Sequence, residues 1–204
     1  MDIMNFLSID CSTDTGSLFV KAKNKTFSKV LQSDKSNNDI LMKQILDFFK
    51  ENNLKIDDLS QIFVNQGPGN FSGLRGSLAI AKGISLSKNL NLFGYNTFLW
   101  SCAKFLSKHK VICCLIKFRE KYFIKEFNTN LQSISKITEI TEDIIIKKYE
   151  DKFKVIPKNM AKYFSQKVLK LPNISIEELD HNVLEFLKLK GLLDENLIKP
   201  LYLG

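Results

Sequence analysis

One glycine-rich stretch constrains the fold of this 204-residue chain more than any other part of it. Ile62–Val64 is a short apolar run and predicts a buried strand. Gly67, Pro68 and Gly69 follow, and they predict a tight turn because glycine reaches backbone angles that other residues avoid and proline fixes its own. A helical pattern begins directly after the turn. The order strand, turn, helix predicts that a helix packs against a sheet here.

The predicted helix carries two rows of small residues. One row is Gly73, Ser77, Ala81 and Ser85, and the other is Gly76, Ala79 and Gly83. We expect Ser72 to be the N-cap, because its hydroxyl can accept a backbone N–H. Glycine inside a helix costs about 1 kcal/mol relative to alanine. The glycines therefore predict that another segment packs very close to this helix.

The turn itself has two interpretations. Backbone N–H groups of a glycine-rich turn at a helix N-terminus can bind an anion. However, the spacing matches neither Gly-x-Gly-x-x-Gly nor the Gly-Lys-Ser/Thr of a P-loop. From spacing alone we interpret the stretch as a tight turn that docks a helix on a sheet.

Taken as a whole string, the stretch is more specific. Residues 67–75 read Gly-Pro-Gly-Asn-Phe-Ser-Gly-Leu-Arg, which closely resembles Gly-Pro-Gly-Ser-Phe-Thr-Gly-Leu-Arg, the signature of the TsaB (YeaZ) family. Members of that family are bacterial proteins of the tRNA threonylcarbamoyladenosine pathway. Residues 81–83 and 94–97 also match family motifs. The resemblance is strong over residues 5–100, weak over residues 110–190, and returns at Pro200–Leu203.

The order of predicted elements indicates an α/β fold. Strands are expected over residues 5–10, 18–22 and 26–31, followed by a helix with an apolar stripe and then by strand, helix, strand, helix. This is the order of the ribonuclease-H-like half of the actin, hexokinase and Hsp70 architecture, a mixed sheet with flanking helices. A lone Rossmann unit would begin strand–helix–strand, without the meander of three strands.

The second half repeats this order less clearly. We expect a hairpin over residues 111–127, a strand over 133–139, helices over 141–149 and 159–169 with a strand at 153–156 between them, and a final helix over 176–190. No linker of low complexity separates the halves. We therefore expect tandem subdomains: residues 1–107, which carry the signature, and a smaller, degenerate subdomain over residues 108–204.

Composition narrows the class of protein. No apolar run approaches the roughly 20 residues of a membrane span, and the first five residues lack the basic flank of a signal peptide, so we expect a cytoplasmic protein. The net charge is +8, but 28 of the 30 basic residues are lysine, whereas base readout and bidentate phosphate contacts favour arginine. We interpret the lysines as a solvated surface, with weak attraction for tRNA within a complex as the alternative.

Metal-binding patterns are missing from the sequence. The four cysteines include no Cys-x-x-Cys pair, and the two histidines, His109 and His181, are 72 positions apart. We expect no metal site and no cofactor, and we expect each histidine at the surface.

Asp10, Ser12 and Thr13 occupy the first phosphate-loop position of the actin-like architecture. In an enzyme of that kind the carboxylate would hold a metal ion or its water and the hydroxyls would touch phosphate. The alternative, which we favour, is that Asp10 caps a turn. Phosphoryl transfer needs a second acidic loop, and Lys117 stands where TsaB relatives often have aspartate; lysine cannot ligate Mg²⁺. We therefore interpret the three residues as a vestigial phosphate loop.

The resemblance implies a role in protein–protein contact. TsaB relatives use the helix after the first three strands and the signature helix to pair with the same two helices of the paralogue TsaD. The matching residues here are Ile40, Leu41, Ile45 and Phe49 on the first helix and Leu74, Leu78 and Ala81 on the second. The alternative is that these side chains only cover the sheet. Arg75 is expected to orient the signature loop or to bond helix carbonyls.

Two functional hypotheses follow. The first is a non-catalytic subunit that binds and stabilises TsaD in the complex that makes N6-threonylcarbamoyladenosine at position 37 of tRNA. TsaE is then an expected third member, tRNA is met only through the complex, and a homodimer through the same helices is expected without TsaD. The second is an ATP-dependent phosphotransferase of the actin-like superfamily that uses Asp10 and the loop Gly67–Gly69.

Overall fold

The computed structural model describes residues 5–13, 15–31 and 40–203. The chain forms two compact units, Met1–Asn96 with Leu193–Gly204, and Thr97–Leu192. The C-terminal segment therefore belongs to the first unit, although it follows the second in sequence. The expected subdomain bounds, 1–107 and 108–204, come from the order of elements alone and do not anticipate this return.

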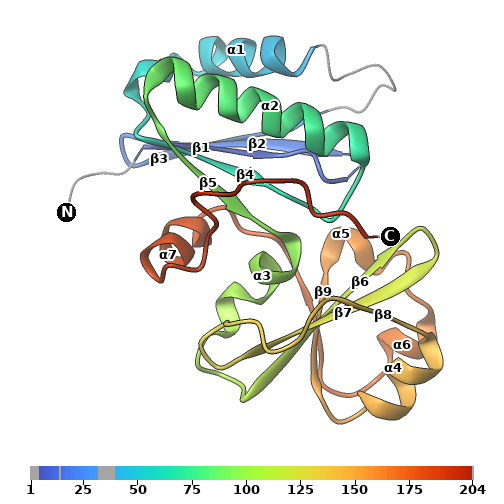
Figure 1. Cartoon of the computed structure of the whole chain (residues 1–204). Helices are drawn as coiled ribbons and strands as arrows, with labels where there is room; N and C mark the ends of the chain where they lie inside the picture. The colour runs from blue at the N-terminus through green and yellow to red at the C-terminus, as the bar shows by residue number, and fades with distance from the viewer. Residues whose placement is uncertain (1–4, 14, 32–39, 204) are drawn as a thin grey trace. The chain divides into compact units, whose positions relative to one another are not determined.

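The first unit is built on a five-stranded sheet in the order β3-β2-β1-β4-β5 (Figure 1). Its strands are β1 Phe6–Asp10, β2 Gly16–Ala22, β3 Lys25–Leu31, β4 Gln61–Asn65 and β5 Asn91–Tyr95. The first three form an antiparallel meander, whereas β4 runs parallel to β1 and β5 parallel to β4. Tight turns suffice for the antiparallel pairs, while each parallel pair needs a crossover through a helix.

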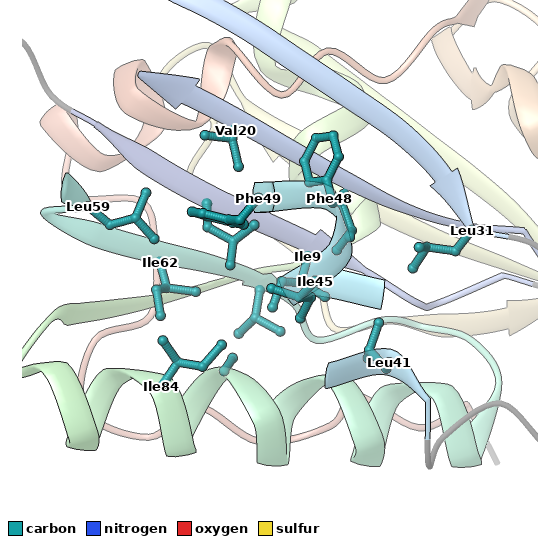
Figure 2. Close-up of a cluster of buried hydrophobic side chains, with 14 of the residues drawn as sticks. Ile9, Val20, Leu31, Leu41, Ile45, Phe48, Phe49, Leu59, Ile62 and Ile84 are labelled. Carbon is teal, nitrogen blue, oxygen red and sulfur yellow. The ribbon is translucent and has the colours of Figure 1, made fainter. Parts of the chain in front are cut away.

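Two crossover helices, α1 Leu41–Glu51 and α2 Phe71–Lys88, lie on the same face of this sheet (Figure 1). The apolar stripe of α1 turns inward, as its spacing of three and four residues dictates. In Figure 2 the stripe meets side chains from β1, β2, β4 and α2. The labelled residues there are Ile9, Val20, Leu31, Leu41, Ile45, Phe48, Phe49, Leu59, Ile62 and Ile84. This cluster is the hydrophobic core between helices and sheet.

The caps of α2 differ from the prediction at one end. Asn70, not Ser72, is the N-cap: its side chain accepts a hydrogen bond from the Ser72 backbone N–H at 3.1 Å. The Ser72 prediction is wrong because Asn70 has the extended backbone that an N-cap requires, and Ser72 already lies in the helix. At the other end, Asn89 adopts the left-handed conformation with φ of 51° and ends the helix.

The second unit repeats the strand order of the first. Its sheet runs β10-β9-β6-β7-β8, with strands β6 Val111–Phe118, β7 Lys121–Asn128, β8 Thr138–Ile140, β9 Phe153–Pro157 and β10 Ile174–Glu177. Three antiparallel strands are again followed by two parallel ones. The tandem ribonuclease-H-like fold predicted from the sequence is confirmed.

The helices of the second unit correct two predictions. They are α3 Thr97–Cys102, α4 Glu142–Lys148, α5 Lys158–Ala161, α6 Gln166–Leu169 and α7 Val183–Leu189, with a short 3₁₀ turn at Ala103–Phe105. A second 3₁₀ turn, Ile56–Asp58, belongs to the first unit. The helix expected over residues 159–169 is two short helices, because Ser165 starts the second one as its N-cap. The helix expected over residues 176–190 begins only at Val183, because 174–177 pair with β9 as a strand. None of the described helices is long and apolar enough to cross a membrane.

Candidate functional site

Three strands of the first unit end in polar residues at one edge of the sheet. Asp10 ends β1, Asn65 ends β4 and Tyr95 ends β5. These strands are parallel, so their carboxyl ends meet at the same edge. Ligands of open α/β sheets bind at such edges. This edge is therefore the candidate site for phosphate or metal chemistry.

The carboxylate of Asp10 accepts hydrogen bonds from within the protein. Its Oδ1 accepts hydrogen bonds from the Ser12 backbone N–H at 2.8 Å and from Asn65 Nδ2 at 3.1 Å. Asn65 Nδ2 also lies 3.3 Å from Ser12 Oγ, and Asn65 Oδ1 accepts the Gly67 N–H at 2.8 Å. Burial raises the pKa of Asp10, and the hydrogen bonds from Ser12 and Asn65 oppose that rise. Asp10 thus ties the loop after β1 to the loop after β4.

The signature loop, residues 67–75, is pressed directly against residues 11 and 12. A Cβ added to Gly69 would lie 1.9 Å from the Ser12 carbonyl oxygen, and one added to Gly73 would lie 2.3 Å from that of Cys11. The Asn70 N–H donates to the same Ser12 carbonyl at 2.8 Å. The close neighbour predicted from the glycines is therefore the backbone of the loop after β1. A phosphate group between Ser12 and Gly69 would have to displace this contact.

The C-terminal segment holds the signature loop from another side. Leu201 N–H donates to the Gln66 carbonyl at 2.7 Å, and Gln66 Nε2 donates to the Lys199 carbonyl at 3.0 Å. Gly67 has φ of +103°, and a Cβ there would lie 3.0 Å from the Leu201 carbonyl oxygen. Sequence reasoning missed Asn65 and Gln66. Their signal was two amide side chains directly after the apolar run Ile62–Val64.

Arg75 contacts the C-terminal segment and not helix carbonyls. Its Nε donates to the Tyr202 hydroxyl at 3.0 Å, and its guanidinium carbon lies 3.9 Å from the centroid of the Phe71 ring. The Phe71 and Tyr202 rings stack with centroids 5.2 Å apart. Of the two roles expected of Arg75, the bond to helix carbonyls is wrong, because the stacked rings hold the guanidinium beside Tyr202 at the start of α2. The other role, orientation of the signature loop, stays a prediction.

The other predicted loop residues do not add a reactive group. The Thr13 hydroxyl donates to the Thr15 carbonyl at 2.9 Å, Ser72 is exposed, and Pro68 is buried after a cis peptide bond. Burial, with a smaller contribution from the charge of Asp10, raises the pKa of the Cys11 thiol to about 12. This thiol is therefore protonated at neutral pH and is a poor nucleophile.

Six of the seven helix residues predicted to contact a partner lie in the core of the first unit. They are Leu41, Ile45, Phe49, Leu74, Leu78 and Ala81. Only Ile40 is exposed, at 40%. Other apolar side chains on the two helices do face solvent: Leu46 is 49% exposed and Leu86 is 84% exposed. A Cβ added to Gly83 would meet nothing within 4 Å, so α2 is open at that position.

Both histidines of the second unit pack against aromatic rings, which corrects the prediction that they are simple surface residues. His109 stacks on Phe153 with ring centroids 3.6 Å apart, and His181 lies against Trp100 at 4.8 Å. Burial lowers the pKa of His181 to about 4, against a smaller opposing effect of Asp180. Within residues 5–13, 15–31 and 40–203, no group of three or more His, Cys, Asp or Glu side chains is placed to hold a metal ion.

The fold places the chain in the class of tandem ribonuclease-H-like, or actin-like, proteins. The solved structure of YeaZ from Pseudomonas aeruginosa superposes with a TM-score of 0.71, over 98% of this chain and 100% of that one, at 14% sequence identity. At that identity the likeness is one of fold.

Sequence comparison identifies the family. The model of the family described as "TsaD: tRNA N6-adenosine threonylcarbamoyltransferase" matches residues 31–177. Curated relatives carry the name tRNA threonylcarbamoyladenosine biosynthesis protein TsaB. The protein of Buchnera aphidicola subsp. Baizongia pistaciae is 30% identical over 53% of this chain and 50% of its own length, and that of subsp. Schizaphis graminum is 29% identical over 74% of each. The chain belongs to the TsaB (YeaZ) family, paralogous to TsaD.

Proposed function

We propose that this chain is a non-catalytic subunit in the synthesis of threonylcarbamoyladenosine in tRNA, and that it binds and stabilises the transferase TsaD in the cytoplasm. The names of its curated relatives support the pathway. TsaE is the proposed third member of the complex, and a homodimer through the same surface is proposed when TsaD is absent.

The closed carboxyl edge of the first sheet carries the proposal. Phosphoryl transfer needs a carboxylate that can hold a metal ion and a loop that can surround phosphate. Here the Asp10 carboxylate accepts hydrogen bonds from Ser12 and Asn65, and Gly69 lies against the Ser12 carbonyl. At the second acidic position, the Lys117 ammonium pairs with Glu120 at 2.9 Å. Asp10 and Lys117, at the two acidic positions that phosphoryl transfer requires, therefore both argue against the phosphotransferase alternative.

The exposed surface of α1 and α2 supplies the contact for TsaD in this proposal. Leu46 and Leu86 present apolar side chains to solvent, and the space above Gly83 is open. A helix can approach a glycine closely because no side chain keeps the backbones apart. We therefore place the proposed TsaD contact on the outward residues of α1 and α2, and not on the buried stripe expected from the sequence.

Co-purification with TsaD tests the proposal. Leu46→Glu and Leu86→Glu place a charge on the proposed contact without disturbing the core, and each should reduce recovery of TsaD at least tenfold. Leu189→Glu is the matched control, because Leu189 is 66% exposed on α7 of the second unit. Charges at Leu78 or Ile45 would test folding instead, since both side chains are buried.

Two results would contradict the proposal. Wild-type recovery of TsaD by both variants would refute the proposed contact. Tight Mg-ATP binding by the purified chain, abolished by Asp10→Ala, would favour the phosphotransferase.

A further inference from the structure

The positive charge of the chain is concentrated in the second unit. Residues 97–192 contain 18 Lys and Arg against 11 Asp and Glu, whereas the rest of the chain contains 12 against 11. The second unit thus carries +7 of the net +8. A general compositional preference for lysine would raise the number of lysines in both units. The asymmetry calls for a local explanation.

One segment of the second unit holds lysine without any acidic residue. Residues 152–176 contain six lysines and no Asp or Glu. Lys154 is buried, with its Nζ donating to three backbone carbonyls, so it does not contribute to the surface. Lys158, Lys162, Lys167 and Lys170 are exposed. This part of the chain therefore presents cations outward over α5 and α6.

The packing of α5 and α6 explains why the lysines point outward. Met160, Phe164 and Val168 recur every fourth residue and are buried, with Phe164 against the Tyr122 ring at 5.4 Å. The anchoring residues leave the intervening side chains on the solvent side. We call that side the lysine face and define it as Lys158, Lys162, Tyr163, Lys167 and Lys170.

The charges on this face are available to a ligand. Lys158 pairs with Glu178 at 3.2 Å in an exposed position, where such a pair is weak. In the described part of the chain, Lys162, Lys167 and Lys170 form no ion pair. Lys147 and Lys148, on the last turn of α4, add charge beside α6, because α4 and α6 pack together.

The face also carries an aromatic ring. Tyr163 is 47% exposed, and Lys162 Nζ lies 4.9 Å from the centroid of its ring. An exposed aromatic ring among cations is the combination by which proteins bind single-stranded nucleic acid: the cations meet phosphates and the ring stacks on a base. A lipid surface would need an apolar side as well. Here the apolar anchors of α5 and α6, which are Met160, Phe164 and Val168, are buried in the core.

We infer that the lysine face binds the phosphate backbone of RNA, with Tyr163 stacking on an unpaired base. The inference rests on the proposed function only for the choice of tRNA as the RNA. It makes the second unit a tRNA-contacting part of the complex, separate from the α1 and α2 surface that is proposed for TsaD.

Fluorescence anisotropy of the full-length chain with a labelled tRNA transcript tests the inference. Lys162→Glu/Lys167→Glu should weaken binding at least tenfold and lower the slope of log K against log salt by about 2, since each lost phosphate contact contributes about 1. Lys25→Glu/Lys55→Glu makes the same change of charge at exposed lysines of the first unit. This control should weaken binding less than about threefold.

Tyr163→Ala separates stacking from charge: affinity should fall several-fold while the salt slope stays unchanged. Equal losses in the two double variants would overturn the inference, because binding would then follow total charge alone. Absence of tRNA binding at low salt would also overturn the inference. So would tighter binding of poly-glutamate than of tRNA, if Lys162→Glu/Lys167→Glu weakened that binding as well. Co-purification of TsaD with Lys162→Glu/Lys167→Glu distinguishes failure of the RNA inference from failure of the proposed function. The proposed contact with TsaD lies on α1 and α2, so this variant should recover TsaD as the wild type does.

Discussion

At the scale of single residues, two glycines of the same helix have opposite surroundings. Gly73, near the start of α2, leaves no space for a side chain because the Cys11 carbonyl lies against it, whereas the space around Gly83 is open. The sequence predicted a close neighbour for the helix and could not say at which glycine, because both fit the same small-residue pattern. Whether a glycine of α2 has a close neighbour depends on the position of the loop after β1. The local sequence of the helix does not determine that position.

Substitution of glycine by alanine should separate these surroundings. Gly73→Ala should lower the free energy of unfolding by about 1–3 kcal/mol, because its Cβ would overlap the Cys11 carbonyl oxygen. Gly83→Ala should raise it by about 0.5–1 kcal/mol, because alanine favours the helix and meets no neighbour. Urea unfolding of both variants measures the difference. If Gly83→Ala destabilised the isolated chain, α2 would not be open there.

Prediction of the candidate site was also partial at this scale. Asp10 and Ser12 could be placed at the end of a strand from the apolar run before them. Asn65 was not singled out, although it bonds both of them. An amide side chain at a strand end has many uses, and only the pairing of β1 with β4 brings this one to Asp10.

At the scale of elements, periodicity predicted α1 and α2 but not the use of their faces. The apolar stripe on α1 was compatible with a partner contact and with a core contact. In the structure the centre of the stripe packs against the sheet. In the second unit, one helix was expected over residues 159–169. Ser165 divides it, because a hydroxyl that caps a new helix competes with continuation of the old one.

Lys154 shows how one buried cation supports an element. Its Nζ donates to the carbonyls of Tyr149, Glu150 and Lys152 at 2.7 Å each, just after α4 ends. Lys154→Met keeps the volume but leaves three carbonyls without this donor, so we expect a loss of about 3 kcal/mol or more, at about 1 kcal/mol for each unmade bond. The exposed Lys152→Met is the control and should change stability by less than about 0.5 kcal/mol.

Chemical unfolding of these two variants decides the point. Equal stability of Lys154→Met and wild type would mean that the three carbonyls find water instead.

At the scale of the whole molecule, the repeated strand order was predictable and the course of the chain end was not. Three antiparallel strands followed by two parallel ones can be recognised from turn lengths and apolar runs. The return of residues 193–204 to the first unit depends on hydrogen bonds between Gln66 and residues more than 130 positions away. Only the resemblance of Pro200–Leu203 to the family pointed to that segment, without saying what it contacts.

Charge distribution and the closure of the polar edge distinguish the two units. The first unit is nearly neutral, closes its own polar edge and exposes apolar residues on α1 and α2. The second unit carries the positive charge and the lysine face. The two proposals made above follow this division: the first unit binds a protein partner and the second unit contacts tRNA.

Hydrogen–deuterium exchange of the full-length chain, with and without TsaD, tests the central claim most directly. We predict that TsaD slows exchange in peptides from Leu41–Glu51 and Phe71–Lys88 and leaves residues 158–170 unchanged. A complex that forms while exchange in both helices stays at the rate of the free chain would contradict the claim.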